Sequence, residues 1–123
     1  MLTGEIKSHD DLADNDMRKG YPRFSKENFP KNLQLVTDLQ KIAKKKGCST
    51  AQLAIAWVKQ QSGKDGNPEI IPIPGATTAS RVEENSTDIT LSEAELADIK
   101  KVLDSFKVVG HRYPEASQAA LEG

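Results

Sequence analysis

The amino-acid sequence predicts an α/β chain that is mostly helical and contains one or two short strands. Two stretches place their apolar residues along one helical stripe, and two Ser-x-x-Gln/Glu patterns are typical of helix starts. The segment EIIPIP, residues 69–74, does not suit a helix because its prolines lack a backbone donor and fix φ. A single strand cannot form a sheet. We therefore expect it either to pair between chains or to belong to a sheet whose other strands are absent.

Composition limits the class of protein. The 123 residues are 37% hydrophobic and carry a net charge of −1, from 17 basic and 18 acidic residues, which does not favour a nucleic-acid partner. No apolar run approaches membrane-spanning length and no signal peptide is recognisable, so we expect a cytoplasmic protein without membrane contacts. Cys48 is the only cysteine, and His9 and His111 stand alone on polar segments. We expect neither a disulfide within the chain nor a metal site.

The first half of the chain combines a long connection with two helices. Residues 1–30 mix glycine, proline and scattered charges without a lasting period, and we expect them to form a loop. An apolar stripe then predicts a helix over 32–46 that ends at a glycine. A capping-box pattern opens a second helix over 50–61, which is apolar nearly all round. This helix pair, residues 31–62, needs more cover than so short a chain provides.

The second half contains the predicted strand and two further helices. We place the strand at 69–73 and a helix capped by Thr78 at 78–86, so that strand, loop and helix span 69–87. A second capping-box pattern opens a helix over 92–106, and the C-terminal helix and tail occupy 92–123. Because no internal repeat is present, we treat residues 1–123 as a single segment.

A candidate anion-binding site lies where the predicted strand ends. A strand, a glycine turn and a helix N-terminus direct backbone N–H groups toward one place. Arg81, one turn into the helix, can hydrogen-bond a phosphate and stack on a flat ring. This chemistry matches an adenine nucleotide that carries an extra phosphate, and the alternative is a capped helix whose Arg81 pairs with Glu83 or Glu84. The candidate binding residues are Gly75, Ala76, Thr77, Thr78, Arg81, Glu84 and Asn85.

Several stretches resemble the aldo-keto reductase family, and they follow one another in the family's order. The sequence IPIPGATTASRVEEN, followed by LSEAEL, resembles the last strand and cofactor loop of these enzymes. LTGEIK resembles the turn after their seventh strand, and NLQLVTDLQKIAKKKGCSTAQLAIAWV resembles the two-helix insert before their eighth strand. GHRYPE resembles the C-terminal tail of the branch with pyridoxal-reductase-like and perakine-reductase-like enzymes. The resemblance covers essentially the whole chain.

This resemblance implies that the chain is the C-terminal fragment of a (β/α)8 TIM barrel that reduces small aldehydes or ketones with NADPH. It implies that Arg81 and the loop from Gly75 to Thr78 hold the adenosine 2′-phosphate of NADP(H). Glu84 and Asn85 would then meet the adenine, and residues 2–5 would lie near the pyrophosphate. Glu5 departs from the family pattern, because lysine is frequent at that position and a carboxylate there faces a phosphate.

The family's catalytic Asp–Tyr–Lys–His tetrad comes from earlier strands, so we expect no catalytic residue here and no activity from the chain alone. Tyr21 and Tyr113 stand outside the family's catalytic context. The alternative is a non-catalytic helical interaction module that self-associates or binds a partner through exposed apolar faces. Its adhesive surfaces would be the helix of Trp57 and the strand at 69–73.

Overall fold

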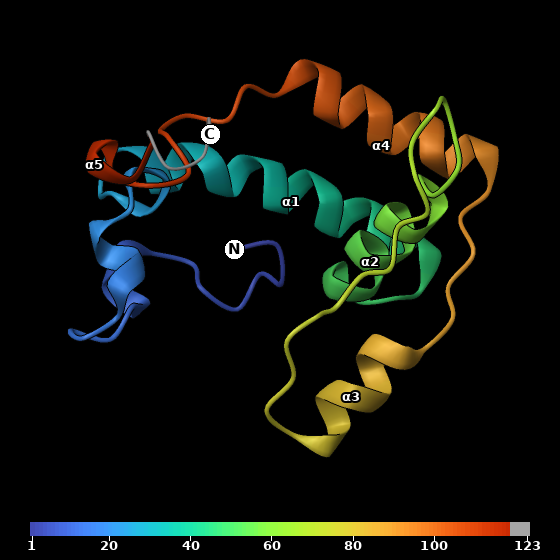
Figure 1. Cartoon of the computed structure of the whole chain (residues 1–123), viewed down its shortest axis with the longest axis horizontal. Coiled ribbons are helices and arrows are strands. Elements are labelled where there is room, and N and C mark those ends of the chain that lie inside the picture. The colour runs from blue at the N-terminus through green and yellow to red at the C-terminus, as the bar shows by residue number, and fades with distance from the viewer. Residues whose placement is uncertain (119–123) are drawn as a thin grey trace.

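The computed structural model describes residues 1–118 and is helical throughout its ordered elements (Figure 1). The longer helices are α1 (Asn28–Lys46), α2 (Thr50–Gln60), α3 (Ala79–Ser86) and α4 (Glu93–Ser105), followed by the short α5 (Glu115–Gln118). The four helices predicted from the sequence are confirmed, apart from the start of the first. Residues 119–123 of the predicted tail lie outside the described residues. Within residues 1–118, no helix is long and apolar enough to cross a membrane.

The helix ends follow the signals read from the sequence. Ser49 and Ser92 each form a complete capping box, with Gln52 and Glu95 respectively. Gly47 ends α1 in the left-handed conformation, with φ of 79°. The predicted start of α1 at residue 32 is wrong, because the helix begins at Asn28. Pro30 fits in the first turn, where a backbone N–H has no helical partner in any case.

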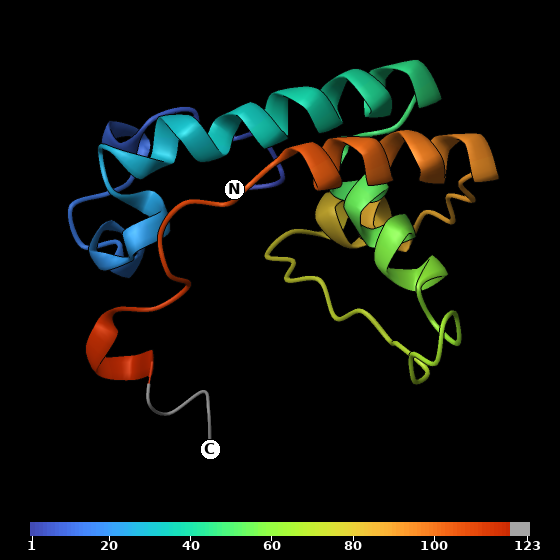
Figure 2. The same cartoon turned by 90° about the horizontal axis from the view of Figure 1, so that it is seen from above.

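The main core lies between α1, α2 and α4. Its buried residues form one cluster: Leu39, Ala43, Leu53, Ala56, Leu91 and Ile99. Figure 2 shows α1 and α4 running side by side, with α2 beneath them. This arrangement buries only one side of α2, and Trp57 and Val58 on that helix are half-buried. The other helices therefore shield the apolar side chains of α2 from solvent only in part.

The predicted loop region over residues 1–30 contains short helical turns and ends where α1 begins at Asn28. Three 3-10 turns form there: η1 (His9–Asp11), η2 (Met17–Gly20) and η3 (Pro22–Phe24). Asn32, 1% exposed, holds this segment and the C-terminal tail against α1. Its side-chain amide donates to the carbonyl oxygens of Arg23 at 3.1 Å and Val109 at 2.9 Å, and its oxygen accepts from Val109 N–H at 3.0 Å.

The predicted strand at 69–73 is also wrong, because residues 1–118 contain no strand. Residues 69–76 run without regular structure toward α3, away from the helical core (Figures 1 and 2). Pro72 and Pro74 cannot donate to a ladder, and residues 1–118 contain no strand that could pair with this stretch. Ile71 and Ile73 are consequently 75% and 92% exposed.

Candidate cofactor site

The candidate site begins where the extended segment enters α3. Thr78 is the N-cap of this helix, and its hydroxyl oxygen accepts from the Arg81 backbone N–H at 3.3 Å. The same hydroxyl lies 3.1 Å from the Ser80 hydroxyl. Capping occupies Thr78 as the sequence predicted, and it fixes the position of Arg81 in the first turn of the helix.

A small polar hollow of about 90 Å³ lies beside this helix start. We call it the polar hollow, and its lining residues are Thr3, Glu5, Ser49, Ala51, Gly75, Arg81, Glu84 and Asn85. Four of the seven predicted site residues therefore come together. Ala76, Thr77 and Thr78 do not line the hollow and are exposed to solvent.

The floor of the polar hollow is tied to the rest of the chain by two hydrogen bonds. The Asn85 side-chain amide donates to the Gly75 carbonyl at 3.4 Å, which closes the loop onto α3. The Gln52 side-chain amide donates to the Glu84 carbonyl at 3.2 Å, which connects α3 to the start of α2. Glu84 and Asn85 are half-buried as a result, whereas Arg81 is exposed.

Arg81 forms an ion pair with a carboxylate from the N-terminal segment, Glu5. Its guanidinium Nη2 lies 2.8 Å from Glu5 Oε1, and the two side chains are 47% and 60% exposed. The alternative reading of the sequence, in which Arg81 pairs with Glu83 or Glu84, is wrong. The pair closes one side of the polar hollow and brings the N-terminal segment to α3.

The polar side chains around the polar hollow suit an anion, with two exceptions. Arg81 supplies a guanidinium, Thr3 a hydroxyl and Asn85 an amide, all of which can donate to phosphate oxygens. Glu5 and Glu84 are the exceptions because an ionised carboxylate only accepts hydrogen bonds. The residues therefore fit the phosphate end of a nucleotide once Arg81 is released from Glu5.

Sequence reasoning did not find Ser49 and Ala51 as lining residues. Ser49 was identified only as a helix cap, and its hydroxyl does accept the Gln52 N–H at 3.1 Å. The capping residue of α2 reaches the polar hollow because α2 and α3 pack together. No local pattern in the sequence indicates this packing.

The two tyrosines that were weighed as catalytic candidates lie outside the polar hollow. Tyr21 and Tyr113 pack edge to face, with 5.7 Å between ring centroids, and help to hold the tail against η3. His9 accompanies them in a structural role, since its Nδ1 lies 2.7 Å from the Phe24 carbonyl oxygen. Among residues 1–118, no group of His, Cys, Asp and Glu side chains is arranged to hold a metal ion.

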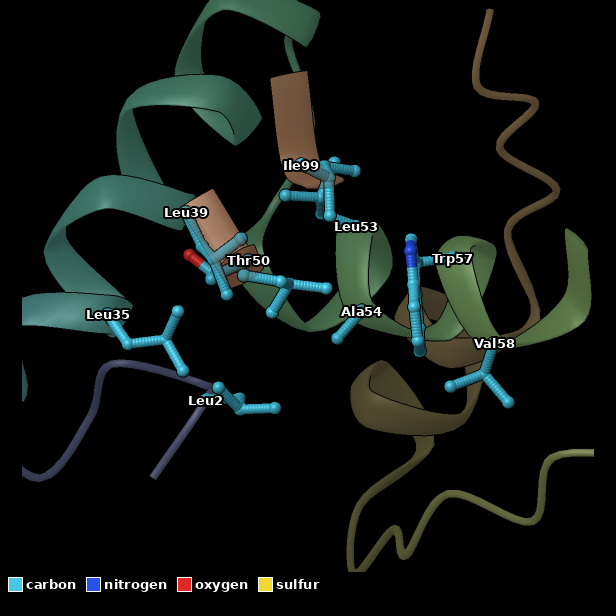
Figure 3. Close-up of a pocket in the computed structure, with 10 residues that line it drawn as sticks. Leu2, Leu35, Leu39, Thr50, Leu53, Ala54, Trp57, Val58 and Ile99 are labelled. Carbon is cyan, nitrogen blue, oxygen red and sulfur yellow. The ribbon is translucent and has the colours of Figure 1, made fainter. Parts of the chain in front are cut away.

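A second hollow, the apolar hollow, opens beside α2 and has a volume of about 170 Å³ (Figure 3). It is lined by Leu2, Leu35, Leu39, Thr50, Leu53, Ala54, Trp57, Val58, Ile99 and Leu103. In Figure 3, Leu2 and Leu35 approach it from the N-terminal segment and α1, and the Trp57 and Val58 side chains project from α2. The apolar hollow thus exposes one face of α2, the helix whose sequence is apolar nearly all round.

An extended segment, a glycine turn and an arginine at a helix start define a candidate site for a phosphate-bearing nucleotide. The Aldo/keto reductase family model matches residues 1–104, and the chain belongs to this family. The family consists of oxidoreductases that form TIM barrels, so these helices come from a barrel-forming sequence family.

Individual relatives agree with this assignment. The chain is 41% identical over 122 residues to the aldo-keto reductase yakc of Schizosaccharomyces pombe, whose name specifies NADP(+); the match covers 98% of this chain and 34% of the relative. It is 38% identical over 125 residues to a Saccharomyces cerevisiae protein named as a pyridoxal reductase, with 94% of this chain and 36% of the relative covered. The chain thus spans about a third of the length of these relatives. No solved structure gives a significant match.

Proposed function

We propose that the chain provides the cofactor-phosphate-binding portion of an NADPH-dependent aldo-keto reductase, which converts a small aldehyde or ketone to an alcohol. The observation that carries this proposal is the polar hollow. Gly75, Arg81, Glu84 and Asn85 line it together, and the sequence pattern alone also predicts these four residues as part of an anion site. The relative whose name specifies NADP(+) supports the choice of cofactor.

Arg81 holds the adenosine 2′-phosphate in this proposal. The Thr77 and Thr78 hydroxyls and the loop N–H groups at the start of α3 lie outside the polar hollow, and they contact the side of the phosphate that faces solvent. Glu84 and Asn85 lie one turn further along the same helix, where they meet the adenine edge. Thr3 and Glu5 line the other side of the polar hollow, where Glu5 lies beside Arg81 and therefore beside the 2′-phosphate. The segment 69–73 becomes a paired strand only when the other strands of a barrel lie beside it.

Comparison of two nucleotides tests the proposal. We expect 2′,5′-ADP to bind the full chain more tightly than 5′-AMP in ligand-observed NMR titrations, because only the former carries the 2′-phosphate that Arg81 holds. Arg81→Ala should remove the difference, since losing a charge-assisted hydrogen bond costs about 1.5–3 kcal/mol, or roughly tenfold to hundredfold in affinity. Arg112→Ala, which removes an exposed arginine outside the polar hollow, serves as the control. Equal binding of both nucleotides by the unmutated chain would overturn the proposal.

The same proposal assigns no catalytic residue to this chain. Tyr21 and Tyr113 contact each other rather than the polar hollow, which supports the reading that neither acts as the general acid. We expect the purified chain to show no NADPH oxidation with pyridoxal or a nitrobenzaldehyde. Activity that disappears on mutation of either tyrosine would contradict this part of the proposal.

A second candidate function is a helical interaction module that self-associates, and the apolar hollow favours it. Leu2 is 41% exposed at the edge of this hollow, and Trp57 and Val58 are only half-buried. We expect light scattering to detect self-association that Leu2→Asp weakens. Val82→Asp, at a 53% exposed position outside the hollow, should leave it unchanged. A clean monomer at high concentration would eliminate this candidate.

A further inference from the structure

Glu5 occupies the position from which a carboxylate can control access to Arg81. Its Oε1 lies 2.8 Å from the Arg81 guanidinium, and both side chains line the polar hollow. A guanidinium that donates to this carboxylate offers fewer donors to an incoming phosphate. Glu5 is thus an internal carboxylate that occupies Arg81 and that an incoming phosphate must replace.

The position of Glu5 is set by a turn rather than by a free chain end. Gly4 adopts φ of 74°, and its N–H donates to the Met1 carbonyl at 3.0 Å. A side chain at Gly4 would meet the terminal amide of the Gln40 side chain and approach Val36, so this turn lies close to α1. The Glu5 N–H also lies within 3.5 Å of the Thr3 hydroxyl oxygen. The turn therefore holds the backbone of Glu5, and the Glu5 carboxylate reaches Arg81 of α3.

We infer that Glu5 is a specificity-determining residue that competes with the 2′-phosphate for Arg81 and reduces the preference for NADP(H) over NAD(H). This inference rests on the proposed function of the polar hollow. The Glu5 carboxylate repels a phosphate placed beside Arg81, and the phosphate must also displace the existing ion pair. A ribose 2′-hydroxyl, in contrast, can donate a hydrogen bond to a carboxylate, and acidic residues accept such a bond in NAD sites.

The exposure of the pair makes Glu5 a competitor and not a permanent block. Ion pairs at such exposed positions are weak and are screened by salt. A phosphate can therefore replace the carboxylate on Arg81, at the expense of part of its affinity. The resulting selectivity is graded: 2′-phosphorylated nucleotides still bind, with a smaller advantage than Arg81 alone would give.

Glu5→Gln tests this inference in the full chain, with 2′,5′-ADP and 5′-AMP as probes. Removing both the competing pair and the repulsion should tighten 2′,5′-ADP binding about threefold to thirtyfold at low salt. Binding of 5′-AMP should stay the same or weaken slightly. The gain for 2′,5′-ADP should shrink as the salt concentration rises.

Glu83→Gln is the matched control because it removes one carboxylate from α3 at a residue that does not line the polar hollow. It should change the ratio of the two affinities less than Glu5→Gln does. If the unmutated chain prefers 2′,5′-ADP and Glu5→Gln leaves that preference unchanged or lowers it, the inference is wrong and the proposed function stands. Equal binding of both nucleotides by the unmutated chain overturns the proposed function and this inference with it.

Discussion

Two regions of this chain differ in how completely they bury their apolar side chains. The helices α1, α2 and α4 enclose a shared cluster that includes Leu53 and Ile99, each 2% exposed. The segment from residue 69 through α3 leaves three large apolar side chains at the surface: Ile71, Ile73 and Val82. Both regions carry clear sequence signals, but only the first finds its packing partners within residues 1–118.

This difference separates two kinds of information in the sequence. Capping residues and apolar stripes act within a few residues, so they define helices wherever the chain supplies a core. A strand requires a neighbour for its backbone groups, and an anion site requires residues brought from elsewhere. The segment 69–86 has the local signals of a strand, a turn and a helix start, and residues 1–118 contain no strand that could pair with it.

Truncation of a core side chain should show the contrast most strongly. Leu53→Ala removes a buried leucine from the cluster and should lower the free energy of unfolding by about 2–5 kcal/mol, because it leaves a cavity. Ile73→Ala, at a 92% exposed position, should change it by less than about 0.5 kcal/mol. Urea unfolding followed by circular dichroism measures both. If Leu53→Ala does not fold, Ile99→Val provides a milder core change, expected to cost about 0.5–1.5 kcal/mol. Similar losses at Leu53 and Ile73 would show that the two regions are packed alike.

Removal of the buried amide of Asn32 should have the next largest effect. Asn32→Ala deprives the Val109 N–H of its acceptor and two carbonyl oxygens of their donor, and we expect a loss of about 1–3 kcal/mol. Hydrogen exchange at the Val109 amide should accelerate more than exchange in α2. Asn67→Ala, in an exposed loop, is the matched control and should have little effect. Unchanged exchange at Val109 would contradict the role of Asn32 as a connector.

The helical part of the fold could be predicted because its signals are local. Ser49, Ser92 and Gly47 act as the sequence indicated. Asn32 was missed, although its position indicates its burial. It precedes Val36, Leu39 and Ala43 on one helical stripe, and all four are buried. A polar residue on such a stripe indicates a buried hydrogen-bonding partner from elsewhere in the chain.

The candidate site could be predicted only in part, for the same reason. Gly75, Arg81, Glu84 and Asn85 were selected from one continuous stretch, where spacing along a helix start carries the information. Glu5 was noted as an unusual charge, yet its contact with Arg81 spans 76 positions of sequence. No local pattern specifies that contact, because it depends on how the Gly4 turn packs against α1.

The smallest expected effect concerns acid stability within the packed region. Glu95 Oε2 accepts hydrogen bonds from the Ser92 N–H at 2.8 Å and from Lys46 Nζ at 3.0 Å. The backbone hydrogen bond from Ser92, followed by the bond from Lys46, lowers the pKa of Glu95 from 4.5 to about 2. These contacts connect the start of α4 to the end of α1.

A carboxyl whose pKa is lower in the folded chain stabilises it above the unfolded pKa and loses that contribution as the pH falls through the folded value. The free energy of unfolding should therefore decline between pH 4.5 and about 2, partly because Glu95 takes up a proton. Glu95→Gln should be less stable than the unmutated chain near pH 6, and the difference should close as the pH approaches 2. Urea unfolding across this range measures the gap. If the difference in free energy of unfolding between the two chains stays constant with pH, Glu95 contributes through its shape and not through its charge. The contact between α1 and α4 would then have no electrostatic contribution from Glu95.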